Sequence, residues 1–514
     1  MLRLAKPFSK PLRKNLSGLK KFFDVIRTPK YVIILLFLIA FLARIPLLYT
    51  EFERENDSID FINVADNLSS GKGYTRSVKA YYFDDEPVVA SGSHAKQIFA
   101  PVVYSLLLKI KNDYYFLQFF ILVIGAVNVV LFYLLARKFM NRELSFLAAL
   151  LIALNPNLII ENRLIVSDQI FYFLVLLFFI VYYKFSLSKK KSILLGALAG
   201  FAYLTRLEGI ILIVIAFFAH IKKPGDAAIV FLSFFMVCSP NIIINYLENG
   251  NAVHSYYFGH YSILDYNEAR QHAYSPFAPP WEFIKENYRL IAERIWHINR
   301  EILTYLAGPR FLGLMAVLLL LINYRKNFRT IRLLTPILAF FIMYYAIHLF
   351  TWSIFCCIQR HLASLYIFLV LVIFALWKES SRKVLYRFVI ITVIIYLLYD
   401  FHQAAWIRKS IGVLEQKKNE PVYTWIRKNI DKDDIIAARY PYNIYLFTQR
   451  PSLLIPEALP IQIEDNKSFK NFLKKYDVKY VYSYNSDLVN FLDKEGKLVY
   501  KTGKDKVYCV FDCQ

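Results

Sequence analysis

The residues best suited to chemistry are charged side chains that stand beside long apolar segments. Asp57 and Asp60 follow the first such segment, and Phe61, Ala65 and Leu68 after them repeat at helical spacing. Asp57 is therefore expected near the N-terminus of an amphipathic helix on the membrane surface, where its carboxylate can accept backbone N–H bonds. Capping alone explains such a residue, but a carboxylate held at the level of a lipid phosphate headgroup could also take part in a reaction.

The other charged candidates interrupt or begin apolar segments. Asp168 begins an apolar helix, where an acid is costly unless it is paired, solvated or bound to a metal ion. Arg206 and Glu208 separate two short apolar runs and could form an internal ion pair. Alternatively, Arg206 or Arg360 could hold a phosphate, because a guanidinium matches phosphate oxygens in a bidentate way. His361 is more simply a packed or solvated histidine than a ligand.

The elements that must position these residues are membrane helices. Hydrophobic residues make up 57% of the 514-residue chain and aromatic residues 17%, which is more than in ordinary globular domains. Most apolar blocks are long enough to cross a hydrocarbon core about 30 Å thick, and two are shorter. Eleven crossings are predicted, at 31–48, 115–135, 144–160, 169–183, 193–204, 210–218, 227–246, 311–322, 333–350, 362–377 and 384–399.

The gaps between these blocks predict the orientation. Every second gap is short and rich in Lys and Arg, as in cytoplasmic loops, whereas the gaps 50–113, 161–168 and 248–310 are longer or less basic. Residues 1–30 are therefore expected in the cytoplasm and the C-terminus outside the cell (plasma or inner) membrane. This distribution also accounts for the net charge of +23 through contact with membrane lipids, and nucleic acid is not expected as a partner.

The chain changes character near residue 408. The transmembrane domain is expected to span 31–405, and residues 408–514 are far less hydrophobic. Short helical and strand-like segments alternate there, which predicts a small extracytoplasmic α/β domain. The expected helices are 421–430 and 469–475, and the expected strands are 435–437, 444–447, 480–482 and 508–511.

Motifs in the membrane body resemble a known family. The first crossing is followed by an acid, an aromatic residue and the motif Ala-x-x-Leu-x-x-Gly-x-Gly-Tyr. Later in the chain, the motif Gly-x-x-x-Gly precedes Thr-Arg-x-Glu-Gly. In this order the motifs resemble those of the GT-C-fold glycosyltransferases that use polyprenyl-phosphate sugars, the relatives of protein O-mannosyltransferases and lipid A aminoarabinose transferases. The resembling segments are 57–74, 100–108, 153–171, 196–209, 239–250 and 359–362.

The resemblance implies roles for particular residues. Asp57 stands where the family has an acidic residue that is presumed to be the catalytic base, and Asp60 one turn later is the reserve candidate. Other motifs of the family contain four supporting residues, Tyr104, Glu208, Asn245 and His361. His361 stands where the family has a tyrosine. The family usually has an arginine immediately before the asparagine, and this chain has isoleucine there.

The expected reaction follows from the same resemblance. One sugar would pass from a polyprenyl-phosphate donor to an acceptor (a protein, lipid or polysaccharide) on the outer face, with inversion, and Asp57 would act as base. Arg206, Arg360 or a divalent metal ion held partly by Asp168 would stabilise the leaving phosphate.

Two other classes stay open at this level. A transporter or flippase for the same lipids would explain many helices, but it would usually show two related halves, and no internal repeat is visible. A membrane scaffold without catalysis would leave Asp57, Asp168, Arg206 and Arg360 dispersed. Clustering of these four residues around one outward cavity would favour the enzyme.

Overall fold

The structure is a computed structural model of the chain. It describes residues 29–49, 56–80, 87–92, 97–186, 188–249, 328–351, 358–377, 417–455, 466–483, 492–494 and 496–511, with isolated positions between 285 and 300 and at 391.

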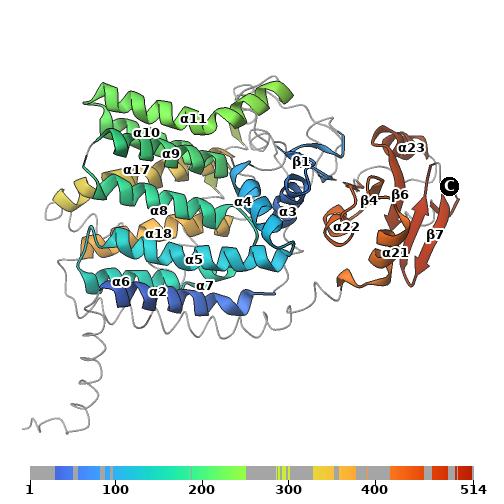
Figure 1. The fold of residues 1–514 in the computed structure, drawn as a ribbon, viewed down its shortest axis with the longest axis horizontal. Coiled ribbons are helices and arrows are strands. Elements are labelled where there is room, and N and C mark those ends of the chain that lie inside the picture. The colour runs from blue at the N-terminus through green and yellow to red at the C-terminus, as the bar shows by residue number, and fades with distance from the viewer. Residues whose placement is uncertain are drawn as a thin grey trace, which may run out of the picture.

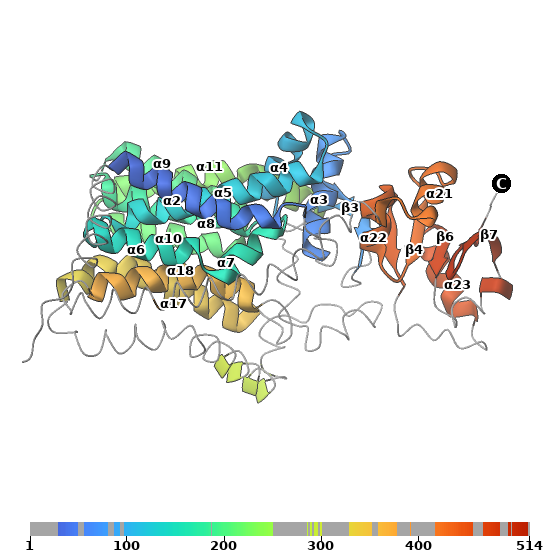
Figure 2. The ribbon, with the colours of Figure 1, turned by 90° about the horizontal axis from the view of Figure 1, so that it is seen from below.

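A bundle of antiparallel helices forms the larger part of the molecule (Figures 1 and 2). Its apolar side chains meet in one extended core. The helices are α2 (Pro29–Arg44), α5 (Tyr114–Ala136), α6 (Arg142–Ala153), α7 (Pro156–Ile160), α8 (Asp168–Lys184), α9 (Lys189–Thr205), α10 (Ile210–His220), α11 (Pro224–Asn249), α17 (Phe328–Thr351) and α18 (Ile358–Trp377).

The predicted crossings agree with these helices in position. Each predicted block within the described residues is mainly helical, and the blocks 311–322 and 384–399 lie outside them. By length and composition, four described helices could cross a membrane: α2 with its extension, α5, α11 and α17. A fifth is added if α6 and the segment after it, which are bent by 57°, count as one span. The number of eleven crossings stays a prediction.

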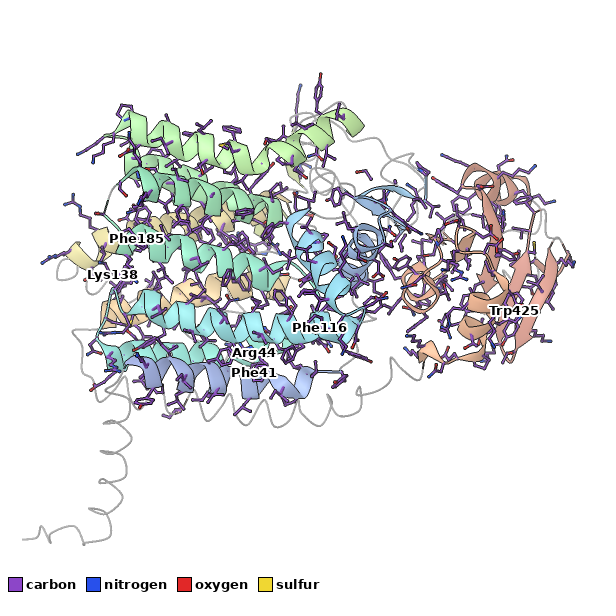
Figure 3. All side chains as sticks on the ribbon, in the orientation of Figure 1. Phe41, Arg44, Phe116, Lys138, Phe185 and Trp425 are labelled. Atoms are coloured by element: carbon purple, nitrogen blue, oxygen red, sulfur yellow. The ribbon has the colours of Figure 1, made fainter. Side chains whose placement is uncertain are left out.

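The two ends of the bundle differ. Lys138 and Phe185, which belong to basic gaps, lie at one end, and Phe116 lies toward the other (Figure 3). The outer-loop helix α3 (Asn56–Ser69) and the C-terminal domain lie beyond the end that Phe116 approaches (Figure 1). The two basic gaps that contain Lys138 and Phe185 are thus at the end opposite to α3, as expected from the positive-inside rule.

Two glycines set how closely α9 and α11 approach. A Cβ atom at Gly196 would lie 2.2 Å from the carbonyl oxygen of Val230, and one at Gly200 would lie 2.9 Å from Cβ of Val237. The Gly-x-x-x-Gly motif therefore forms a close helix contact of the kind common in membrane proteins. This contact holds the C-terminal end of α9 in place.

Within the described residues, the first predicted outer loop, 50–113, contributes two helices and three short strands. They are α3, β1 (Thr75–Arg76), β2 (Val78–Lys79), β3 (Ala90–Ser91) and α4 (Phe99–Ile110). As predicted, Asp57 lies in the first turn of α3, and the helix ends before Gly71 and Gly73. Both glycines have a positive φ, 81° and 82°, which a residue with a side chain adopts only with strain.

Residues 417–511 contribute an α/β unit. Its elements are α21 (Pro421–Asn429), β4 (Ile435–Ala438), α22 (Pro441–Thr448), β5 (Ser452–Leu454), α23 (Asn466–Lys475), β6 (Val478–Ser483), β7 (Lys497–Thr502) and β8 (Asp505–Cys509). The segment 444–447, predicted as a strand, instead lies within α22. Its apolar residues are buried on all sides, so periodicity could not separate helix from strand, and Pro441 in the first turn favours the helix.

Among the residues described, the sheet of this unit has six strands in the order β2-β5-β4-β6-β8-β7. The first four are parallel, and β8 pairs antiparallel with both β6 and β7. The edge strand β2 comes from the first outer loop, with Val78 opposite Ser452 and Lys79 opposite Leu453. The first loop and the C-terminal unit are therefore parts of one sheet, which the separate domain boundaries drawn from the sequence did not anticipate.

Candidate functional site

The start of α3 is fixed to the segment that leads into α8. Asp57 is half-buried in the first turn of α3. The next residue, Ser58, is completely buried, and its Oγ accepts a hydrogen bond from the backbone N–H of Ile165 at 3.2 Å. Ile165 precedes Asp168 by three residues, so this bond brings the helix that carries Asp57 close to a second candidate carboxylate.

Tyr104 on α4 holds the same segment from another side. Its hydroxyl donates to the carbonyl oxygen of Val166 at 2.7 Å, and its buried ring meets the ring of Phe61 edge to face at 6.2 Å. Helices α3 and α4 thus both form hydrogen bonds with the segment before Asp168. The sequence indicated Tyr104 through a motif, whereas Ser58 carried no signal that distinguished it from other serines.

Arg206 lies between two carboxylates at the end of the bundle that faces α3. Its Nη1 donates to Asp168 at 2.7 Å, and its Nη2 and Nε donate to the two oxygens of Glu208 at 2.9 and 3.3 Å. The guanidinium also lies 5.9 Å from the ring centre of Phe171. All three charged side chains are buried, with exposed fractions of 2–7%. The structure therefore contains the internal ion pair of Arg206 and Glu208, with Asp168 as a third member.

This triad bears on the metal and phosphate hypotheses. Its formal charge is −1, and the guanidinium of Arg206 already serves two carboxylates. Within the described parts of the chain, no group of three or more His, Cys, Asp or Glu residues could hold a metal ion. Among the described residues, Asp168 is therefore not part of a set of ligands of the kind that a divalent cation needs. The role of Arg206 in phosphate binding stays a prediction.

The remaining predicted residues are placed less completely. Asn245 is buried near the C-terminal end of α11. Arg360 and His361 lie in the first turn of α18, but their side chains fall outside the description. Asp60 accepts a hydrogen bond from the hydroxyl of Tyr442 at 3.3 Å, so this reserve candidate contacts the C-terminal unit.

Sequence reasoning missed the buried carboxyl group on α3. Asp66 is 8% exposed and accepts hydrogen bonds from the hydroxyls of Tyr114 at 2.6 Å and Tyr445 at 3.4 Å. It therefore joins α3, the start of α5 and α22. Desolvation by burial raises the pKa of Asp66 from 3.8 to about 6, and the two tyrosine hydrogen bonds lower the pKa in part. A buried helical position with polar neighbours distant in sequence has no local signature.

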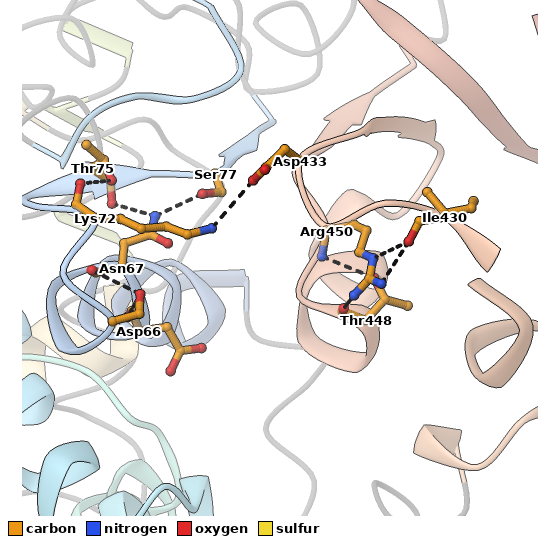
Figure 4. Close-up of polar contacts among 10 residues, drawn as sticks. Asp66, Asn67, Lys72, Thr75, Ser77, Ile430, Asp433, Thr448 and Arg450 are labelled. Atoms are coloured by element: carbon orange, nitrogen blue, oxygen red, sulfur yellow. Dashed lines mark hydrogen bonds and ion pairs between the residues drawn. The ribbon is translucent and has the colours of Figure 1, made fainter. Parts of the chain in front are cut away.

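The C-terminal half of α3 also holds the strand that enters the sheet. Asn67 donates to the carbonyl oxygen of Thr75 at 3.0 Å and to the hydroxyl of Ser77 at 2.9 Å (Figure 4). At the exposed side of the same junction, Lys72 lies 4.0 Å from Asp433. The outer-loop helix is thus attached to the C-terminal unit by hydrogen bonds, an ion pair and a shared sheet.

We expect the protein to be destabilised when the cation of the triad is removed and both carboxylates remain. Arg206→Gln leaves Asp168 and Glu208 buried without their shared partner, which should lower the free energy of unfolding by about 3–5 kcal/mol. The triple variant Asp168→Asn, Arg206→Gln, Glu208→Gln removes all three charges and should recover much of that loss. Thermal unfolding of the purified proteins in detergent measures both. Unchanged stability of Arg206→Gln would contradict this account of the triad.

The raised pKa of Asp66 predicts a pH-dependent stability. Because the native state binds this proton more tightly than the unfolded chain, the stabilisation is complete below about pH 4 and disappears as the pH rises through 6. A shift of about two pKa units corresponds to about 3 kcal/mol. Asp66→Asn keeps an acceptor oxygen but removes the titration, so its unfolding profile between pH 4 and 7 should be flatter.

The control for this profile is Asp433→Asn, because the side chain of Asp433 is 95% exposed and is solvated in both states. It should retain the wild-type slope. A wild-type slope in Asp66→Asn would show that another group causes the pH dependence.

Comparison with known proteins agrees with this architecture. Residues 95–244 match the model of the dolichyl-phosphate-mannose-protein mannosyltransferase family. No curated protein matches the chain. The oligosaccharyltransferase of Archaeoglobus fulgidus in complex with zinc and sulfate is 16% identical, with a TM-score of 0.53 over 93% of this chain and 73% of that one.

Two structures with bound lipid phosphates are also similar. AglB of Archaeoglobus fulgidus, with an inhibitory peptide and a dolichol-phosphate, is 14% identical, with a TM-score of 0.53 over 94% of this chain and 74% of that one. ArnT of Cupriavidus metallidurans, bound to undecaprenyl phosphate, is 11% identical, with a TM-score of 0.55 over 94% and 97%. The resemblance found in the sequence is thus confirmed: the chain has the GT-C fold and is similar to the polyprenyl-phosphate-dependent glycosyltransferases.

Proposed function

We propose that this protein is a membrane glycosyltransferase that moves a sugar from a polyprenyl-phosphate donor to an acceptor on the extracytoplasmic face. The observation that carries the proposal is the attachment of the Asp57 helix to the segment before Asp168, which is itself paired with Arg206. This grouping at one end of the bundle favours an enzyme over a scaffold. Similar folds that bind dolichol-phosphate and undecaprenyl phosphate support a lipid-phosphate donor.

Asp57 is the proposed general base. An acceptor hydroxyl would attack the anomeric carbon while the bond from that carbon to the polyprenyl phosphate oxygen breaks, and Asp57 would take the hydroxyl proton. Attack from the face opposite the leaving group inverts the anomeric centre. Asp57 is half-buried, so its carboxylate can meet an acceptor without the full cost of a buried charge.

The leaving group gains negative charge on its phosphate and needs cations nearby. Arg206 and Arg360 are the proposed sources. Arg206 would exchange part of its contact with Asp168 for phosphate oxygens, and Glu208 would keep the guanidinium in place through its two hydrogen bonds. A divalent cation stays a further proposal, and no step of this mechanism depends on it.

The proposed location is the plasma or inner membrane of the cell. In the proposed orientation, the N-terminus lies in the cytoplasm. The α3 end of the bundle and the C-terminal unit would then lie outside. This assignment rests on the basic gaps that contain Lys138 and Phe185, which lie at the far end of the bundle (Figure 3).

The role of Asp57 can be tested by substitution. Asp57→Asn retains the size and hydrogen bonding of the side chain but cannot accept the proton, so turnover should fall by about 10²–10⁴-fold. Asp60→Asn, one helical turn away, should have a much smaller effect. The measurement is release of polyprenyl phosphate in proteoliposomes supplied with undecaprenyl- and dolichyl-phosphate sugars and an envelope extract as acceptor source.

This readout does not require the acceptor to be known, and mass spectrometry of the extract then identifies the glycosylated product. Wild-type turnover by Asp57→Asn would exclude Asp57 as the base. If no donor releases polyprenyl phosphate with the wild-type protein, the transferase proposal itself fails.

A further inference from the structure

A basic cleft separates the start of α5 from the C-terminal unit. Its volume is about 870 Å³, which is within the size range of small-molecule sites. The turn 111–115 forms the bundle side. Three basic residues and the end of α22 with the turn after it form the other side: Lys418, Arg427, Lys432 and 446–450.

The lining of this cleft carries a strong positive charge. Among the lining residues that the structure describes, five side chains are cationic and Asp113 is the one acid. Asp113 is already engaged, because it caps α5 through the backbone N–H of Tyr115 and pairs with Lys111 at 3.0 Å. An anion that enters the cleft therefore meets an excess of positive charge.

The two arginines are held rigidly by neutral groups. Arg450 is 6% exposed and donates to the carbonyl oxygens of Thr448 and Ile430 at 2.6 and 2.8 Å. Arg427 donates to the carbonyl oxygens of Phe447 at 2.7 Å and Lys418 at 3.0 Å. These bonds fix the guanidinium groups without neutralising their charge.

Acids outside the lining do not cancel this charge by direct contact. Asp431 and Asp434 are close enough to act electrostatically on Arg450, but Asp434 forms its short contact, 2.6 Å, with Lys479. In the described part of the chain, Lys418, Arg427, Lys432 and Arg450 make no ion pair with a carboxylate within 4.0 Å. Lys418 and Lys432 are exposed and available to a ligand.

The position of the cleft relates it to the candidate catalytic residue. Tyr114, which lines the cleft, donates its hydroxyl to Asp66 on α3. Asp66 is nine residues after Asp57, which corresponds to about 14 Å along the helix. Cleft and candidate base are therefore at opposite ends of the same helix, where a single extended molecule could contact both.

We propose that this cleft binds a phosphate group of the acceptor, so that the acceptor is an anionic molecule held there while its hydroxyl group reaches Asp57. Lysine and arginine side chains form charge-assisted hydrogen bonds with phosphate oxygens. The identification of this ligand as the acceptor rests on the proposed transferase function. Binding of a phosphate group to the cleft can be measured without turnover.

The test uses the full-length protein and native mass spectrometry with two probes. Glucose 1-phosphate, compared with glucose, reports a free phosphorylated saccharide. Phosphatidylglycerol, compared with phosphatidylcholine, reports a lipid headgroup. Preferential binding of either anionic probe supports the proposal and identifies the source of the phosphate.

The variant Lys418→Gln, Lys432→Gln removes two exposed cations and leaves both arginines in place. It should bind the anionic probe about tenfold or more weakly. The control Lys494→Gln, Lys504→Gln removes two exposed lysines of the same unit that do not line the cleft, and it should bind as the wild type does. Equal affinities of the two double variants, or no preference for the anionic probes, would overturn the proposal.

The variant Asp57→Asn separates this proposal from the proposed function. It should bind the anionic probe with wild-type affinity, because Asp57 does not line the cleft. Binding by a protein that shows no transfer with any donor would support the anion site and reject the transferase. Transfer by a protein that does not bind the anionic probes would support the transferase and reject the anion site.

Discussion

The guanidinium of Arg206 between Asp168 and Glu208 is the interaction on which the α3 end of the bundle depends. It joins the start of α8 to the end of α9, and α9 is in turn pressed against α11 at Gly196 and Gly200. Burial makes the triad costly to break, so the segment before α8 is held in one position. The bonds from Ser58 and Tyr104 to that segment then place α3. The position of Asp57 therefore depends on the buried ion triad.

The opposite end of α3 is fixed by the C-terminal unit. Asp66 accepts from tyrosines of α5 and α22, and the strand β2 that follows α3 completes the edge of the sheet. The helix is therefore held at both ends by elements far apart in the sequence. A reaction at the start of α3 and an anion site near its end would share a rigid frame, which is how scaffolds position groups for catalysis.

Features with a local cause could be predicted from the sequence. The apolar blocks within the described residues are helices because their length and composition leave few alternatives, and α3 ends before Gly71 and Gly73 for conformational reasons. The pairing of Arg206 with Glu208, two residues away, was also foreseen as one alternative. What escaped prediction was non-local: the two-residue strand β2 pairs with residues more than 370 positions later, and Ser58 and Asp66 gain their roles only through distant partners. The prediction of a strand at 444–447 was wrong, because burial on every side hides helical periodicity.

We propose that the α3 end of the bundle binds the polyprenyl phosphate donor beside Asp57. A cryo-electron microscopy structure of the full-length protein in lipid nanodiscs with undecaprenyl phosphate tests it most directly. The account predicts phosphate density at the end of the bundle that contains Arg206 and the start of α18, within hydrogen-bonding distance of Arg206 or Arg360 and open toward Asp57. Phosphate density at the opposite end, near Lys138, would contradict the account, as would a saturated complex with no phosphate near α3.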